Sequence, residues 1–150
     1  MKTFDDLNLS KQLRFAIDDL GFTTPTPIQH EAYPIILSGK NVVGIAQTGT
    51  GKTLGYMLPI LQGLKFSNQI PPRVLILGPT RELVMTVVEQ IQLVTKYVNL
   101  RVLGVYGESN INTQRQLCAQ GTDIIVATPG RLYDLGLGRE LQLKSISKLV

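Results

Sequence analysis

The stretch Ala46–Thr53 carries the residue types best suited to chemistry: Ala-Gln-Thr-Gly-Thr-Gly-Lys-Thr. Gly49 and Gly51 permit backbone conformations in which successive N–H groups point at an anion. Lys52 can reach the outer phosphates of a nucleotide, and the Thr53 hydroxyl can bind a Mg²⁺ ion that bridges them. The stretch therefore predicts a phosphate-binding loop, although the general pattern has a glycine at its first position.

Two elements must position this loop. The apolar run Val42–Ile45 directly before it predicts a short buried strand, and a helix is predicted from Lys52 onward. Pro59 should kink this helix or end its first part. Strand, glycine-rich turn and helix in this order are typical of phosphate-binding loops. An ordinary connection in an α/β domain is the alternative, and the flanking elements favour the nucleotide site.

The rest of the chain alternates between helices and strands. Helices are predicted after the capping residues Ser10 and Thr26, at residues 112–119, after Thr128, and from the segment Pro79–Leu83 to about Tyr97. In that last helix the predicted core stripe is Leu83, Val87, Ile91 and Val94. Four more strands are expected at residues 73–77, 101–106, 122–127 and 146–150. The alternation predicts an α/β fold with a parallel sheet flanked by helices on both faces, and ligands at the carboxyl ends of its strands.

Polar turns follow several of the predicted strands. The phosphate loop, Pro79–Glu82, Gly107 and Thr128–Arg131 all come directly after strands, so they are expected on one edge of the sheet. Two of these turns combine a capping threonine, the start of a helix and an arginine, which suits the binding of phosphate groups. Ordinary helix capping with solvated charges is the alternative for each turn alone. Together, beside a nucleotide loop, they indicate a track for a polyanion.

The segment Gly21–Gln29 combines an aromatic ring, a proline-locked extended stretch and an amide in the first turn of a helix. Phe22 offers a flat apolar face for a planar base. The Gln29 amide can donate and accept hydrogen bonds together, as the edge of adenine requires. The alternative, which the pattern alone favours, is a turn before a helix with Phe22 in the core and Gln29 as a local cap.

The composition sets limits on the class of protein. The chain has 150 residues, of which 43% are hydrophobic and 17% charged, as in a folded single domain rather than a disordered chain. A net charge of +4 suits a polyanionic partner. The single cysteine, Cys118, is expected to be buried and cannot form an internal disulfide, and the single histidine, His30, leaves no His/Cys metal cluster. Without a signal-peptide pattern or a membrane-spanning run, a cytoplasmic protein is predicted.

In order and spacing, these motifs resemble the first RecA-like domain of the DEAD-box RNA helicases over essentially the whole chain. Gly21–Gln29, within the segment of residues 1–30, resembles the Q motif, and Ala46–Thr53 resembles motif I of a RecA-like P-loop NTPase domain. Pro79–Leu83 resembles motif Ia, Gly107 the glycine motif, and Thr128–Leu132 motif Ib. The first residue of motif I, Ala46, is irregular for a general phosphate loop but usual in this family.

The resemblance implies ATP and Mg²⁺ as cofactors and RNA as the partner. The residues implied in binding the cofactor are Phe22, Thr24, Gln29, Gln47, Thr48, Gly49, Thr50, Gly51, Lys52 and Thr53. Of these, Lys52 and Thr53 have the catalytic roles, and Thr53 is the Mg²⁺ ligand. The residues implied in contacts with the RNA backbone are Pro79, Thr80, Arg81, Gly107, Thr128, Gly130 and Arg131. The family closes two such domains on single-stranded RNA when ATP binds, so we expect a monomer with a second RecA-like domain in the same protein.

Two departures qualify the resemblance. Glu108 stands where the family usually has a second glycine, and a carboxylate beside an RNA phosphate is repulsive. The Asp-Glu-Ala-Asp motif should begin just after Val150, so residues 1–150 are expected to be a domain truncated before that motif, incomplete at its C-terminal end and inactive alone. A non-catalytic nucleotide- or RNA-binding module is the alternative. A P-loop enzyme acting on a small molecule ranks below it, because it leaves the edge turns unexplained.

Overall fold

The computed structural model describes residues 3–47, 49 and 51–150. The chain forms two compact units. The helical unit comprises Met1–Lys65 and Gln90–Asn99, and the sheet unit comprises Phe66–Glu89 and Leu100–Val150. No helix within the described ranges is long and apolar enough to cross a membrane.

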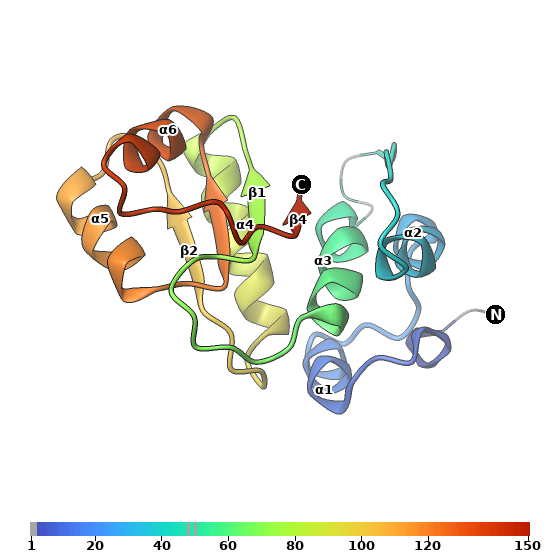
Figure 1. Cartoon of the computed structure of the whole chain (residues 1–150). Coiled ribbons are helices and arrows are strands. Elements are labelled where there is room, and N and C mark those ends of the chain that lie inside the picture. The colour runs from blue at the N-terminus through green and yellow to red at the C-terminus, as the bar shows by residue number, and fades with distance from the viewer. Residues whose placement is uncertain (1–2, 48, 50) are drawn as a thin grey trace. The chain divides into compact units, whose positions relative to one another are not determined.

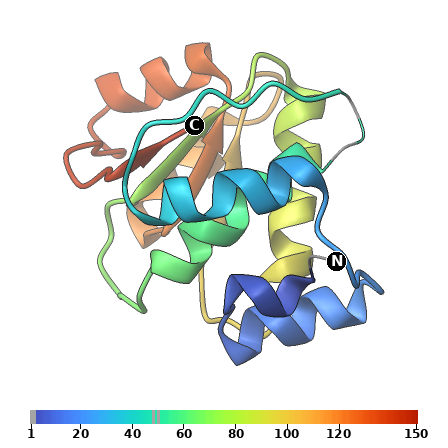
Figure 2. The same cartoon turned by 90° about the vertical axis from the view of Figure 1, so that its right-hand side faces the viewer.

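The helical unit is built from short helices around an apolar core. A 3₁₀ helix, η1 (Phe4–Leu7), is followed by α1 (Lys11–Asp19), α2 (Pro27–Leu37) and α3 (Lys52–Gly63). The last residues of α4 (Arg81–Val94) also belong to this unit. Helices α2 and α3 lie side by side (Figure 2).

The ends of α1 follow the sequence signals. The Ser10 hydroxyl accepts a hydrogen bond from the N–H of Leu13 at 3.4 Å, which is the predicted N-cap. At the other end Gly21 takes the left-handed conformation with φ of 77°, and its N–H donates to the carbonyl of Asp18. The next N–H, of Phe22, donates to the carbonyl of Ile17. These paired bonds form the C-terminal stop that glycine permits.

One prediction for the region around the phosphate loop is corrected, and one of the two alternatives predicted for Pro59 is excluded. Val42–Ile45 forms no strand, and Val43 and Ile45 are 90% and 91% exposed. A strand requires a partner for its N–H and C=O groups, and the four strands that the structure describes all belong to the sheet unit. In α3, the helix does not end at Pro59 but continues to Gly63. The buried residues on both sides of Pro59 stabilise the helix there, although the proline removes one backbone hydrogen bond.

The sheet unit contains the predicted parallel sheet. Its strands β1 (Val74–Leu77), β2 (Val102–Val105), β3 (Ile124–Ala127) and β4 (Lys148–Leu149) pair in the order β2-β3-β1-β4, all parallel (Figure 1). Each strand lies within one of the segments predicted from apolar runs. The connections between them carry the start of α4, then α5 (Ile111–Gln120) and α6 (Pro129–Leu137).

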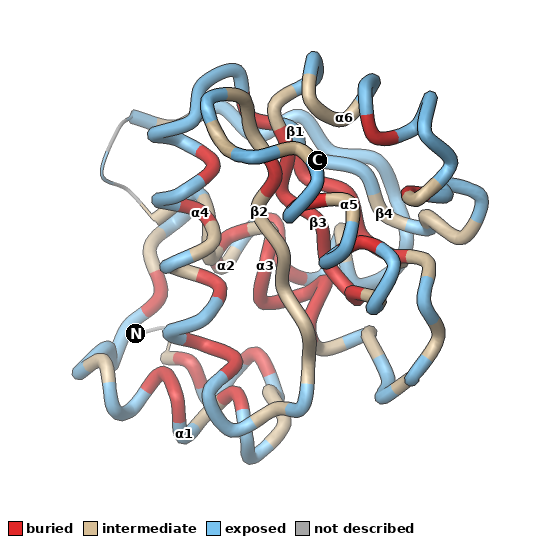
Figure 3. Tube along the Cα trace, turned by 90° about the vertical axis from the view of Figure 1, so that its left-hand side faces the viewer, coloured by how far each residue is buried: buried red, intermediate tan, exposed pale blue. Residues whose placement is uncertain are grey.

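Helices cover both faces of this sheet. On one face, strand side chains including Leu75, Val105 and Ile125 form a buried cluster with Cys118 of α5 and Leu135 of α6. On the other face α4 lies so close to β2 that a Cβ on Gly104 would be 3.1 Å from a Val88 methyl group and 3.4 Å from one of Val84. Figure 3 shows buried residues along β1 and β3. The predicted α/β fold is confirmed.

The core stripe of α4 differs from the prediction at one position. Val87, Ile91 and Val94 are buried as expected, but Leu83 is 44% exposed, and Val84 is fully buried in its place. Both choices have helical spacing to Val87, so periodicity alone cannot separate them. The close approach of Val84 to Gly104 on β2 decides which residue faces the sheet.

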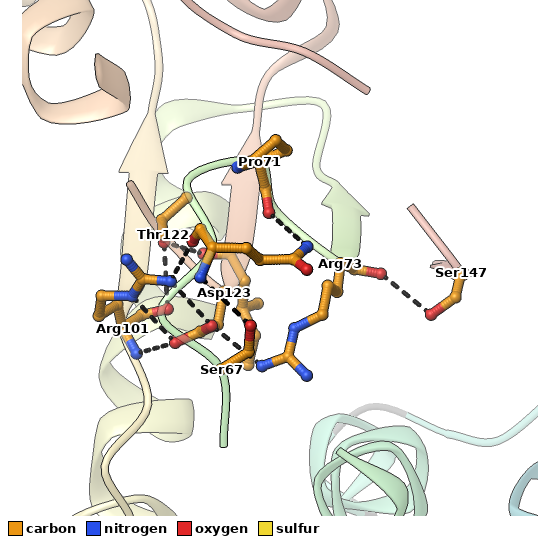
Figure 4. Close-up of polar contacts among 9 residues, drawn as sticks. Ser67, Pro71, Arg73, Arg101, Thr122, Asp123 and Ser147 are labelled. Carbon is orange, nitrogen blue, oxygen red and sulfur yellow. Dashed lines mark hydrogen bonds and ion pairs between the residues drawn. The ribbon is translucent and has the colours of Figure 1, made fainter. Parts of the chain in front are cut away.

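A buried carboxylate joins the amino-terminal ends of three strands (Figure 4). Asp123, directly before β3, is 1% exposed. Its Oδ1 accepts hydrogen bonds from Nη2 of Arg73 at 3.0 Å and from Nη2 of Arg101 at 3.1 Å. Its Oδ2 accepts from the backbone N–H of Arg101 at 2.8 Å and from Nε at 3.2 Å. Because Arg73 precedes β1 and Arg101 precedes β2, this network fixes the edge opposite the polar turns.

Candidate functional site

The phosphate loop ends where α3 begins. Gly49 and Gly51 have positive φ angles of 83° and 79°, and Gly51 is the N-cap of the helix. This is the conformation for which the sequence analysis requires glycine. Lys52, the first residue of α3, is exposed, and Thr53 is half-buried. Thr48 and Thr50, also predicted to bind the cofactor, lie outside the described residues.

The start of α3 has groups that suit a nucleoside triphosphate with Mg²⁺. The helix start presents N–H groups that have no acceptor within the helix, beside an exposed lysine. Within residues 3–47, 49 and 51–150, no group of three His, Cys, Asp or Glu side chains could hold a metal ion. A Mg²⁺ ion that accompanied a nucleotide could take oxygen ligands from its phosphates, from water and from the Thr53 hydroxyl.

Tyr56 is a neighbour of Thr53 that the sequence analysis did not single out. It lies one turn further along α3, close enough to Thr53 for the two side chains to interact. Burial raises the pKa of Tyr56, and the interaction with Thr53 lowers it in part. The i, i+3 spacing on a predicted helix was the available signal for this contact.

Gln29 connects the segment that resembles the Q motif to the phosphate loop. Its side chain is buried, its Oε1 accepts from the N–H of Thr26 at 2.9 Å, and its Nε2 donates to the carbonyl of Gly51 at 3.2 Å. The Thr26 bond is the local cap that the pattern alone favoured. The Gly51 bond joins two motifs that are 22 residues apart. A Cβ on Gly51 would overlap the Gln29 amide, so a side chain there would displace that amide from its hydrogen bonds, and the positive φ favours glycine as well.

The other residues predicted to surround the adenine are at the surface. Phe22 is 45% exposed, so the alternative of a core phenylalanine is wrong. Thr24 and Gln47 are also exposed. The accessible ring of Phe22 and the Gln29 amide, some of whose hydrogen-bonding capacity is already used, are therefore present in the same unit as the phosphate loop.

In the sheet unit, three of the predicted turns meet at one edge. The carboxyl-terminal residues of β1 and β2 both pair with Ala127 at the end of β3. The backbone joins the turns directly, because Gly78 N–H donates to the Ala127 carbonyl at 2.9 Å and Thr128 N–H donates to the Val105 carbonyl at 3.0 Å. The phosphate loop was predicted on the same edge, but it belongs to the helical unit.

Two of these turns start helices in the predicted manner. The Thr80 hydroxyl accepts from the N–H of Leu83 at 3.2 Å at the start of α4. Thr128 is the N-cap of α6, with Pro129 as the first helical residue. The exposed residues at the two starts include Pro79, Thr80, Arg81 and Gly130.

Arg81 contacts the turn that follows β2. Its Nη1 lies 3.3 Å from Oε2 of Glu108, and its guanidinium lies 5.3 Å from the centre of the Tyr106 ring. Glu108 has a φ of 66°, in the left-handed region. This is the residue that departs from the family's second glycine, and its backbone adopts a conformation that glycine reaches without strain.

The Arg131 guanidinium forms hydrogen bonds within the protein. Its Nη1 donates to the carbonyl of Ser109 at 3.1 Å and to Oε1 of Gln114 at 2.8 Å. The buried Gln114 in turn donates to the Ser109 hydroxyl at 2.6 Å, and that hydroxyl donates to the carbonyl of Tyr106 at 2.9 Å. The sequence analysis missed Ser109 and Gln114, because only the folded chain brings α5 and α6 to the same turn.

Comparison with known proteins places this geometry in a family. The sequence model of the DEAD/DEAH box helicase family matches residues 26–150. The chain belongs to this family. The resemblance drawn from the motifs is therefore confirmed.

Individual relatives match almost the whole chain. It is 41% identical to the ATP-dependent RNA helicase DeaD of Escherichia coli over 149 residues, covering 99% of this chain and 24% of that protein. It is 41% identical to the ATP-dependent RNA helicase RhlB of Pseudomonas syringae over 157 residues, covering 98% of this chain and 39% of the relative. It is 43% identical to the human probable ATP-dependent RNA helicase DDX43 over 154 residues, covering 99% of this chain and 24% of the relative. The chain thus spans only part of the length of these relatives.

Proposed function

We propose that the protein containing this chain is an ATP-dependent RNA helicase, and that the chain is the N-terminal part of its first RecA-like domain. The observation that carries the proposal is the meeting of three capped or glycine-containing turns at one sheet edge, in a chain that belongs to the DEAD/DEAH box helicase family. In the same proposal a second RecA-like domain of the protein closes on the RNA, and the protein acts as a monomer in the cytoplasm.

The helical unit would bind the nucleotide. Bound ATP with Mg²⁺ would supply a terminal phosphoanhydride bond, and its hydrolysis by water would reset the protein after the two domains have closed on RNA. Lys52 would contact the outer phosphates and the Thr53 hydroxyl would hold the metal. The loop residues Gln47, Thr48, Gly49, Thr50 and Gly51 would surround the phosphates with backbone N–H groups.

Gln29 retains the capacity to recognise adenine despite its internal bonds. A side-chain amide has two N–H donors and an oxygen with two lone pairs. One donor is used on Gly51 and one lone pair on Thr26, which leaves one of each for a base. Phe22 would stack on the ring, and Thr24 would line the same site.

The sheet edge would bind the RNA backbone. At the starts of α4 and α6, the first N–H groups have no acceptor within their helix, so they suit phosphate oxygens. The contacts would involve Pro79, Thr80, Arg81, Gly107, Thr128, Gly130 and Arg131. Among the described residues, apart from its chain neighbours and its own helix backbone, a Cβ on Gly107 or Gly130 would meet no atom within 4 Å, and neither glycine has a positive φ. Neither internal packing nor local conformation requires glycine at these two positions, which supports the close approach of an external ligand.

The test is RNA-stimulated ATP turnover by the whole protein. We expect hydrolysis that rises on addition of single-stranded RNA, and a loss of nucleotide affinity in Lys52→Ala. The exposed Lys144→Ala is the control for removal of a positive charge elsewhere. If Lys52→Ala retains nucleotide affinity within about a factor of two of the wild type, where loss of a charged phosphate contact should cost tenfold or more, the phosphate-loop assignment is wrong.

The chain alone should be inactive. Residues 1–150 contain no Asp-Glu-Ala-Asp motif and no second domain to complete the site. We therefore expect nucleotide binding without RNA-stimulated turnover from the 150-residue chain, with its folding checked by circular dichroism. Robust turnover by this chain would contradict the proposed division of roles.

A further inference from the structure

The strongest unassigned feature is the pairing of two oppositely charged side chains at the predicted RNA edge. Arg81 is the first residue of α4, and Glu108 lies in the turn after β2, 27 residues further along the chain. The side chains are 43% and 81% exposed, so both are accessible to a ligand from solvent. The guanidinium also lies over the Tyr106 ring, 5.3 Å from its centre, which is within the range of a cation–π contact.

The turn that carries Glu108 is held on its inner side. The Ser109 hydroxyl donates to the carbonyl of Tyr106, Gln114 donates to that hydroxyl, and Arg131 donates to the Ser109 carbonyl. Glu108 itself adopts a left-handed backbone conformation, which is uncommon for a residue with a long side chain. Its carboxylate therefore extends from a fixed turn toward Arg81.

A carboxylate and a phosphate diester compete for the same partner. Both are anions whose oxygens accept charge-assisted hydrogen bonds from a guanidinium. An RNA phosphate that reaches Arg81 must replace Glu108, and the released carboxylate then lies close to the phosphate and repels it. Each consequence weakens RNA binding.

We propose that Glu108 acts as an internal substitute for an RNA phosphate at Arg81 and so lowers the affinity of the protein for single-stranded RNA. Glu108 is then an affinity-determining residue of this edge rather than a neutral replacement for glycine. This inference rests on the proposed function. Because the pair is exposed, its removal should tighten binding about two- to fivefold, the range that an exposed ion pair supports.

The experiment is a double-mutant cycle in the whole protein. Wild type, Glu108→Gln, Arg81→Ala and the double variant are titrated with fluorescein-labelled single-stranded oligouridylate and a non-hydrolysable ATP analogue, at several salt concentrations. Glu82→Gln is the matched control, because it removes the same charge from the exposed residue next to Arg81. Glu108→Asn is a second variant, since asparagine tolerates the left-handed conformation and lacks the charge.

We expect both Glu108 variants to bind RNA about two- to fivefold more tightly than the wild type. The dependence of log affinity on log salt should steepen by up to about 0.7, the slope of one further phosphate contact on a single strand. In the Arg81→Ala background, Glu108→Gln should tighten binding less than it does in the wild type, because the competition for the guanidinium is lost and only the repulsion between carboxylate and phosphate is relieved.

Other outcomes overturn the inference in distinguishable ways. One such outcome is an unchanged RNA affinity in both Glu108 variants; another is an equal gain in RNA affinity from Glu108→Gln with and without Arg81. Either result shows that Glu108 does not compete for the guanidinium. RNA binding and the proposed function would stand. If Arg81→Ala binds RNA as tightly as the wild type, Arg81 is not a phosphate contact. The inference then fails, and the proposed function again stands. Absence of RNA binding by the wild-type protein refutes the proposed function, and the inference fails with it.

Discussion

Asp123 should make one of the largest single contributions to the stability of the sheet unit. The perturbation is Asp123→Asn, which keeps the size of the side chain and removes its charge. The carboxylate accepts two hydrogen bonds from the Arg101 side chain, one from Arg73 and one from the Arg101 backbone N–H (Figure 4). An asparagine oxygen can keep the backbone bond, so the loss falls on the three bonds from guanidinium groups.

The magnitude follows from these three bonds. A hydrogen bond to a charged group contributes about 1 kcal/mol more than a neutral one, which gives a loss of roughly 3 kcal/mol. The side chains of Arg73 and Arg101 are 15% and 34% exposed, and water recovers part of this loss. We expect Asp123→Asn to lower the free energy of unfolding by about 2–3 kcal/mol at pH 7, a fall in Tm of roughly 5–10 °C for a chain of this size.

The effect should depend on pH with a definite sign. Burial raises the pKa of Asp123, but the hydrogen bonds from Arg101 and Arg73 outweigh burial and hold the pKa below its ordinary value. A group whose pKa is lower in the folded state contributes its full stability above the unfolded value, about 4, and loses it as the pH falls through the folded value. The difference between wild type and Asp123→Asn should therefore be constant near neutrality and shrink below about pH 4.

Urea unfolding of the chain, followed by circular dichroism, measures the free energy. Hydrogen exchange of peptides from β1, β2 and β3 locates the loss, because the chain has two compact units and stability need not be uniform across a structure. The control is Asp134→Asn on the exposed surface of α6, which should change stability by less than about 0.5 kcal/mol. A change in Asp123→Asn no larger than in this control would refute the assignment of the network as a stabilising one.

Three further predictions concern ligand binding by the whole protein. Gln29→Ala should weaken ATP binding by about 1–2 kcal/mol, the value of one or two hydrogen bonds, and relax discrimination against GTP in competition assays; an unchanged preference for ATP counts against the adenine site. Arg131→Ala should weaken the binding of all RNA sequences alike and reduce the slope of log affinity against log salt by up to about 0.7, because a phosphate contact carries no base information. A loss of affinity for only some sequences in a panel of RNAs contradicts this. Gly107→Ala should leave the Tm close to that of the wild type, since its Cβ meets open space, but it should lower the affinity for RNA in the same titration. An unchanged RNA affinity would show that Gly107 is not part of the interface.

Local signals in the sequence predicted most of the elements. Apolar runs placed β1, β2 and β3 within one or two residues, and Ser10, Thr80 and Thr128 marked helix starts correctly. These features depend on neighbours within a few residues, such as the N–H groups that a capping hydroxyl accepts from. Such neighbours can be read directly from the sequence.

Features with distant partners could not be predicted in the same way. Val42–Ile45 has the composition of a buried strand, but a strand also needs a paired neighbour, and the described structure of this segment has none. Asp123 looks like an ordinary polar residue before a strand, yet its bonds to Arg73 and Arg101 span 50 and 22 residues. The contacts of Arg131 with Ser109 and Gln114 likewise depend on the meeting of α5 and α6 at one turn.

Some glycines of this chain are explained by the fold itself, and others are not. Gly51 has a positive φ and no room for a Cβ beside Gln29, so the folded loop itself explains it. Gly104 is explained by α4, whose Val88 lies against it. Gly107 and Gly130 have ordinary φ angles and open space where a Cβ would be, so nothing within the described chain accounts for their lack of a side chain. Both lie at the sheet edge where the turns meet, and Glu108 follows one of them with its charge directed at Arg81. Under the proposed function, the bare backbone at Gly107 and Gly130 would favour approach of a phosphate chain, while the adjacent carboxylate would limit how tightly that chain could bind.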